Sequence, residues 1–67
     1  MNLDYLHNFL MVTELGSIAE AARRLGLSPT TLAQRLKALE ASVGTPLLVR
    51  AGHTVKPTLA GTRITEN

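Results

Sequence analysis

The residues best suited to making specific contacts lie on one side of residues 29–43, a segment with the pattern of a helix. At about 100° per residue, Thr30, Gln34, Lys37 and Ala41 fall within about 60° of one another, opposite an apolar stripe. Glutamine can form two hydrogen bonds to an adenine edge, and threonine or alanine can pack on a thymine methyl group. The same side chains also suit a solvated helix face. The scarcity of charge pairs at i,i+4 spacing favours a contact surface.

Charge is distributed unevenly along the chain. The sequence contains seven Lys and Arg residues and five Asp and Glu residues, for a formal net charge of +2. All seven basic residues lie between positions 23 and 63, where Glu40 is the only acidic residue, so this stretch carries +6 (seven minus one). Residues 1–22 carry −3. Such segregation favours a polyanionic partner for one face, and a solvated basic surface is the alternative explanation.

Patterns typical of catalysis are missing from the sequence. It has no cysteine, and its two histidines, His7 and His53, fall in unrelated elements and do not suggest a metal site. No Gly-rich phosphate loop, nucleophile elbow or dinucleotide fingerprint occurs. A chain of 67 residues also has a thin core and little room for a deep catalytic cleft. We therefore expect no enzyme activity, no catalytic residues and no metal.

Glycines divide the first two-thirds of the chain into three predicted helices. The first helix shows a three- and four-residue repeat made by Leu3, Leu6, Phe9, Leu10 and Thr13. Gly16 suits the end of this helix, and the adjacent Ser17 with Glu20 forms a capping-box pattern at the start of the next. The second helix is predicted at about 18–25, with its small and apolar residues on one side.

The third helix is predicted at 29–43, after a short turn that contains Gly26. Ser28 followed by Pro29 is a favourable start for a helix, and Gly44 with Pro46 ends it. Its apolar stripe consists of Leu32, Leu36, Leu39 and Val43. Two helices joined by a turn of about three residues form a helix-turn-helix, which we place at about 18–37.

A β-hairpin, or wing, is predicted at about 47–56. The β-prone runs 47–50 and 54–56 flank a turn at Ala51-Gly52-His53. Thr58 can cap a fourth helix from residue 59, and Gly61 weakens its first turn. We expect the chain to stop inside a longer helix rather than at a natural terminus. The predicted fold class is mainly α: a winged helix-turn-helix with a three-helix core, a short hairpin and the start of a fourth helix.

The length predicts one small domain, residues 1–58, followed by a truncated linker segment, residues 59–67. No apolar run approaches the length that a bilayer requires, and Asp4 precedes every basic residue, which is opposite to a signal peptide. The absence of cysteine gives no sign of an oxidising compartment. We expect a soluble, intracellular domain without membrane contact.

The chain resembles the DNA-binding domain of LysR-type transcriptional regulators along nearly its whole length, and the stretch from Phe9 to Gly61 carries most of the resemblance. The landmarks, specific in combination, are Leu6, Phe9, Gly16-Ser17-Ile18, Ala21-Ala22, Leu25, Leu27-Ser28, Leu32, Leu36, Leu39-Glu40, Gly44, Pro46-Leu47-Leu48, Arg50, Thr58 and Ala60-Gly61. The resemblance implies sequence-specific binding of double-stranded DNA in the bacterial cytoplasm, with the third helix in the major groove and the wing on the backbone and minor groove. It also implies a homodimer or tetramer formed through the linker helix. No cofactor is expected in this fragment, because a small-molecule co-effector would bind a C-terminal domain that it lacks.

The resemblance also implies a set of DNA-contacting residues. They are Ser28, Pro29, Thr30, Thr31, Ala33, Gln34 and Lys37 on the third helix, and Arg50, His53 and Lys56 on the wing. Among them, Gln34 is the preferred base reader, Thr31 supports a phosphate near the helix N-terminus, and Arg50 contacts the backbone. Pro29 and Ala33 replace a glutamine and a serine that the family often has. His53 replaces a common arginine, which affects a minor-groove contact at neutral pH.

Two basic or acidic residues of the third helix are expected to be structural. Arg35 lies beside the apolar stripe, so we expect its stem to pack there and its guanidinium to pair with a carboxylate. Glu40 belongs to the Leu-Glu pair of the resemblance.

Two alternative functions stay open: a winged-helix module for protein interaction, and the DNA-binding domain of a molybdate-responsive-type regulator. The segregated charge and the presence of only two aromatic residues argue against a protein-interaction surface.

Overall fold

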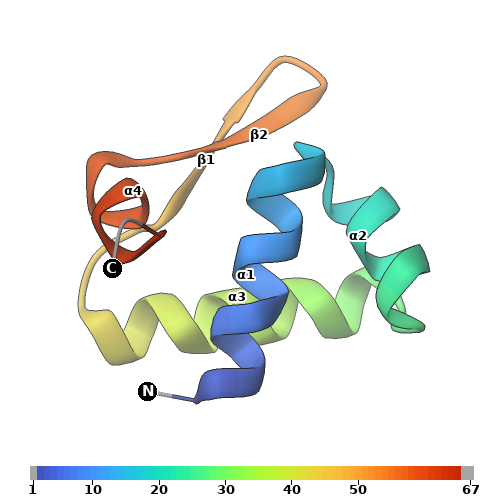
Figure 1. Ribbon diagram of the computed structural model, residues 1–67, viewed down its shortest axis with the longest axis horizontal. Helices are drawn as coiled ribbons and strands as arrows, with labels where there is room; N and C mark the ends of the chain where they lie inside the picture. Colours follow the sequence, from blue (N-terminus) through green and yellow to red (C-terminus); the bar gives the residue numbers. More distant parts are fainter. Residues whose placement is uncertain (1, 66–67) are drawn as a thin grey trace.

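The computed structural model describes residues 2–65 as four helices and one antiparallel hairpin. The elements in chain order are α1 (Leu3–Leu15), α2 (Ile18–Leu25), α3 (Pro29–Val43), β1 (Leu48–Ala51), β2 (Thr54–Pro57) and α4 (Leu59–Thr65). Figure 1 shows α1 crossing α3, with α2 at one end of α3, α4 on the other side of α1, and the hairpin passing over the C-terminal end of α1. The predicted winged helix-turn-helix is confirmed. The last two residues of the predicted linker segment, 66 and 67, lie outside the described residues.

The helix boundaries follow from side-chain and glycine caps that the sequence indicates. Gly16 ends α1 in the left-handed conformation, with φ of 69°, and the Ser17 hydroxyl oxygen accepts the Glu20 amide at 3.1 Å. The Glu20 carboxylate does not complete the expected capping box. It pairs instead with Arg23 at 2.8 Å and lies 3.6 Å from Arg24, because both guanidinium groups follow it by one helical turn.

The core forms where α1, α2 and α3 meet the start of the wing. Its buried apolar residues are Phe9, Val12, Ala21, Ala22, Leu32, Leu36, Leu39 and Leu47. The predicted stripe of α3 is confirmed, with Val43 half-buried at its end. The pattern predicted for α1 is partly wrong, because Val12 is fully buried while Leu3 is 69% exposed. Leu3 opens the first turn of α1, and the core residues of α1 begin one and a half turns later.

A polar contact joins α1 to α3 beside this core. The Arg35 guanidinium donates to Asn8 Oδ1 at 3.1 Å and lies 5.3 Å from the centroid of the Tyr5 ring. Asn8 is only 6% exposed, so the arginine supplies a partner for a buried amide. The expected carboxylate partner of Arg35 is therefore wrong. An amide oxygen and an aromatic face take its place.

The wing is attached to the helices at both ends. Oε2 of Glu40, on α3, accepts the amides of Leu47 and Leu48 at 2.6 and 3.3 Å, which confirms the structural role expected for Glu40. Further along, the Val55 amide donates to the Gly16 carbonyl oxygen at 3.0 Å, where α1 turns into α2. These bonds fix the hairpin against the helix-turn-helix.

β1 begins and ends one residue later than predicted, whereas β2 begins at Thr54 as predicted and is one residue longer. Ala51 pairs with Thr54, so the connection contains only Gly52 and His53, and Pro57 is the last residue of β2. Gly52 has φ of 66°, which the first position of a type II′ turn favours. Leu47, whose side chain is fully buried in the core, immediately precedes β1.

Gly61 marks the place where α4 approaches the core most closely. A Cβ atom there would overlap the Leu47 carbonyl oxygen and lie 3.0 Å from Phe9 Cζ. Thr58 caps this helix as predicted: its hydroxyl oxygen accepts the Gly61 amide at 3.1 Å. None of the described helices is long and apolar enough to cross a membrane.

Candidate nucleic-acid interface

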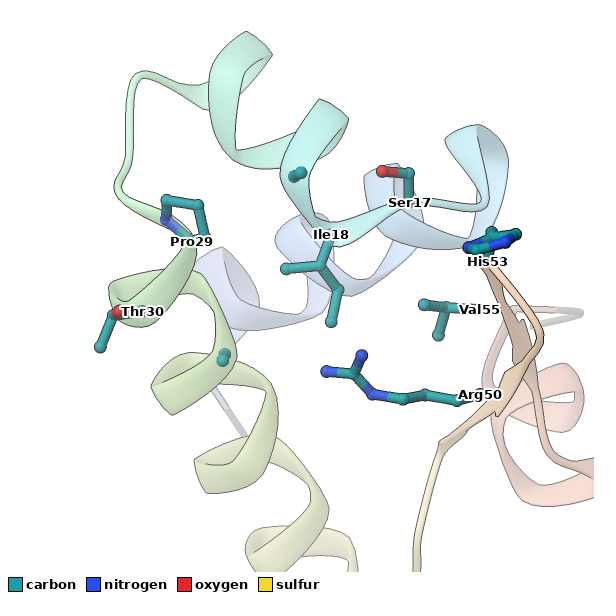
Figure 2. A pocket seen from close by; sticks show the side chains of 9 residues that line it. Ser17, Ile18, Pro29, Thr30, Arg50, His53 and Val55 are labelled. Carbon is teal, nitrogen blue, oxygen red and sulfur yellow. The ribbon is translucent and has the colours of Figure 1, made fainter.

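A cleft of about 420 Å³ opens between the helix-turn-helix and the wing. Its walls come from three elements: Ser17, Ile18 and Ala19 at the start of α2, Pro29, Thr30 and Ala33 in the first half of α3, and Arg50, His53 and Val55 on the hairpin. Figure 2 shows Ile18, Arg50 and Val55 between the three elements, with Ser17 and His53 at one end of the cleft and Pro29 and Thr30 at the other. Five of the ten residues predicted from the sequence to contact DNA therefore line one cleft.

Arg50 is the central cation of this cleft. Figure 2 shows its side chain extending from the wing toward Ile18 and α3. Arg50 pairs with Val55 across the hairpin, so both side chains are on the face that turns toward the helices. An adjoining cavity of about 180 Å³ contains Arg50 again, together with Ala33 and Lys37 of α3. The wing and α3 thus present two positive charges along one continuous surface.

The surface of α3 beside the cleft is exposed and carries little charge. Thr30, Gln34 and Lys37 are exposed, as a contact role requires. Gln34 lines neither the cleft nor the adjoining cavity, because it lies further round the helix. Its amide is available to a ligand that covers the outer side of α3.

Two other predicted residues are already engaged at the start of α3. The Ser28 hydroxyl oxygen accepts a hydrogen bond from the Thr31 amide at 3.1 Å, and the Ser28 O–H donates to Thr31 Oγ1 at 2.9 Å. The pair therefore caps α3, and neither residue lines the cleft. Backbone amides at this helix end favour an anion nearby. The predicted role of Thr31, to support a phosphate there, stays a prediction.

The structure does not bring Lys56 to the cleft. Lys56 pairs with Val49, and successive side chains of a strand point to opposite faces, so Lys56 lies on the face of the hairpin away from Arg50. Its predicted DNA contact would require a ligand that reaches around the edge of the wing.

The acidic residues nearest to this surface are occupied elsewhere. Glu40 lines the adjoining cavity, but its carboxylate accepts the two wing amides. Glu20 pairs with Arg23 and Arg24 on α2. Within residues 2–65, no group of three or more His, Cys, Asp or Glu side chains could hold a metal ion. The cleft is thus positive, shallow and suited to an anionic surface rather than to a metal or a buried substrate.

The comparison with protein families decides what kind of domain carries this cleft. Residues 3–62 match the model of the bacterial regulatory helix-turn-helix proteins of the lysR family. The chain belongs to the LysR family. Of the two regulator families considered from the sequence, this is the one that the match describes, and the resemblance is confirmed.

Individual relatives agree with this LysR-family assignment. The chain is 43% identical over 61 residues to the HTH-type transcriptional regulator BudR of Raoultella terrigena. That alignment covers 91% of the chain and 21% of BudR, so the chain spans about a fifth of the length of this relative.

Solved structures of LysR-family members superpose closely on the chain. The structure of the CbnR_DBD-DNA complex has a TM-score of 0.91 and 36% identity, and covers 98% of this chain and 76% of that one. The BenM_DBD/catB site 1 DNA complex also has a TM-score of 0.91, with 32% identity, covering 98% of this chain and 73% of that one. Full-length AphB of Vibrio cholerae has a TM-score of 0.93 and 33% identity, covering 100% and 23%.

Four cleft residues of this LysR-family domain were not among those predicted from the sequence. They are Ser17, Ile18, Ala19 and Val55. The sequence indicated Ser17 as a helix cap and as one landmark of the resemblance, and nothing local to it indicates a second surface. The Val55–Gly16 hydrogen bond, which joins residues 39 positions apart, is what places the wing over the start of α2.

Proposed function

We propose that this chain binds double-stranded DNA in a sequence-specific manner as the N-terminal domain of a LysR-type transcriptional regulator. The observation that carries the proposal is the convergence of Thr30 and Ala33 of α3 with Arg50 of the wing on one positive cleft. α3 has an exposed face of suitable width for the major groove, and the adjacent wing reaches the backbone and the minor groove. DNA complexes of two structural neighbours support this arrangement.

In this proposal, contacts to phosphates and contacts to bases contribute differently to binding. Arg50 and Lys37 interact with phosphates and supply affinity that does not depend on sequence. Gln34 reads a base edge, and the small side chains Thr30 and Ala33 allow α3 to approach the groove closely. Pro29 contributes shape without a hydrogen-bond donor.

The rest of the regulator would determine how the domain is used. We propose that the full-length protein is a homodimer or tetramer formed by a continuation of α4, which places two copies of α3 in successive major grooves about 34–36 Å apart. A small-molecule co-effector would bind outside this chain. The relatives are named as transcriptional regulators, and we propose no catalytic activity for this domain.

Fluorescence anisotropy with a labelled duplex of mixed sequence tests the proposal. The logarithm of affinity should fall linearly with the logarithm of salt concentration, and Arg50→Ala should reduce that slope by about one. Arg24→Ala is the matched control, because Arg24 is also exposed and basic but lies on α2 outside the cleft. The control should retain the wild-type slope. A folded chain that fails to bind at low salt would overturn the proposal and favour a protein-interaction module.

Selection from a randomised duplex pool tests the base-reading role of Gln34. Gln34→Ala should lose discrimination at one base position, at a cost of about 1–3 kcal/mol there. The salt slope should remain unchanged because no phosphate contact is removed. An identical selected sequence for the variant and the wild type would contradict this assignment.

A further inference from the structure

The tip of the wing carries a titratable group at the edge of the positive cleft. His53 is the second residue of the two-residue turn between β1 and β2, and its side chain is exposed. It lines the same cleft as Arg50 and Ser17. Figure 2 places His53 at the end of the hairpin, at the same end of the cleft as Ser17.

The residues that line the cleft together with His53 include one cation, Arg50, and no carboxylate. Arg50 is the one charged side chain among the described residues that line the cleft, since those from α2 and α3 are neutral. Glu14, in the last turns of α1, does not line the cleft, and Glu20 of α2 pairs with arginines. No acidic group of the cleft is therefore placed to stabilise the imidazolium form. An anion bound in the cleft would supply that missing negative charge.

We propose that His53 contacts a DNA phosphate as imidazolium, so that DNA binding by this chain takes up at most one proton and strengthens as pH falls. This inference rests on the proposed function. Histidine side chains ordinarily titrate near pH 6.5, and a neighbouring phosphate favours the charged form. Neutral imidazole supplies no charge to the interface. The wing thus makes one phosphate contact fewer when the imidazole is neutral than when it is charged.

The expected change in DNA affinity with pH follows from counterion release. Each neutralised phosphate contributes about 0.9 to the salt slope, which corresponds to about eightfold in affinity at 0.1 M salt relative to 1 M. Raising the pH from 5.5 to 8.0 should therefore weaken binding by up to about eightfold at 0.1 M salt. The salt slope should fall by about 0.9 over the same interval.

Anisotropy titrations of a labelled mixed-sequence duplex at pH 5.5 and 8.0, each at several salt concentrations, test the inference. His53→Gln should bind equally at both pH values, and His53→Arg should bind at both as tightly as the wild type does at pH 5.5. His7→Gln is the matched control, because His7 is the other histidine and is exposed on α1 away from the cleft. It should retain the full pH dependence.

The outcomes separate this inference from the proposed function. Wild-type binding that is independent of pH, or a pH dependence that persists in His53→Gln, would overturn the inference while leaving DNA binding intact. Absence of binding by the folded chain at both pH values and at low salt would overturn the proposed function itself.

Discussion

Replacing Gly61 with alanine should destabilise the domain, although alanine is the better helix former. The added Cβ would overlap the Leu47 carbonyl oxygen and lie 3.0 Å from Phe9 Cζ and 3.2 Å from Pro57 Cβ. Leu47 and Phe9 are both fully buried, and the overlapping atom belongs to the backbone. A rotamer change therefore cannot relieve the contact, and α4 or the wing must move.

The size of the effect follows from three contributions. Alanine gains about 1 kcal/mol over glycine inside a helix. Overpacking in a tightly packed site costs about 1–3 kcal/mol. A shifted Leu47 carbonyl also weakens its 2.9 Å hydrogen bond from the Thr58 amide, at a cost of about 1 kcal/mol. The free energy of unfolding should thus fall by about 1–3 kcal/mol, which lowers Tm by roughly 5–20 °C in a domain of this size.

Urea and thermal unfolding followed by circular dichroism at the helix band measure this change. Leu59→Ala is the matched control, because Leu59 is in the same helix and 73% exposed. Its free energy of unfolding should stay within about 0.5 kcal/mol of the wild type. A Gly61→Ala variant as stable as the wild type, or more stable, would refute the close-packing argument.

Two further variants test the contacts that hold α3 in place. Glu40→Ala removes the acceptor of two wing amides and should lower the free energy of unfolding by about 1–3 kcal/mol in urea titrations; a wild-type value would contradict the role of Glu40 in anchoring the wing. Arg35→Ala leaves the buried Asn8 amide oxygen without its partner and should cost about 1–3 kcal/mol, while the salt slope of DNA binding stays that of the wild type. A slope reduced to that of Arg50→Ala would show instead that Arg35 contacts phosphate.

Local chemistry made the helices predictable from the sequence. Glycine is the residue that most readily adopts the left-handed conformation, and Gly16, Gly26 and Gly44 all end helices in it. Ser17 and Ser28 each accept an amide three residues ahead, so the starts of α2 and α3 follow from single residues. The exposed face of α3 was likewise predictable, because an apolar stripe at helical spacing determines which side faces the core.

Contacts between distant segments were not predictable in the same way. The sequence indicated that Arg35 lies beside the core, but its partner Asn8 is 27 residues away and has no pattern that marks it as buried. From the sequence alone, Gly61 is a residue of low helix propensity that weakens the first turn of its helix. Its reason for being glycine is a carbonyl oxygen of the buried residue Leu47, which only the docked α4 brings close.

The sequence by itself determined the order of the elements, the ends of the helices and which side of α3 faces outward, because caps, glycines and helical periodicity act over a few residues. The tertiary structure alone decided that Arg50 and His53 share a cleft with Ser17 and that Lys56 lies on the other face of the wing. Those placements depend on the hairpin register and on the bond between Val55 and Gly16, which arise from packing between segments far apart in the chain.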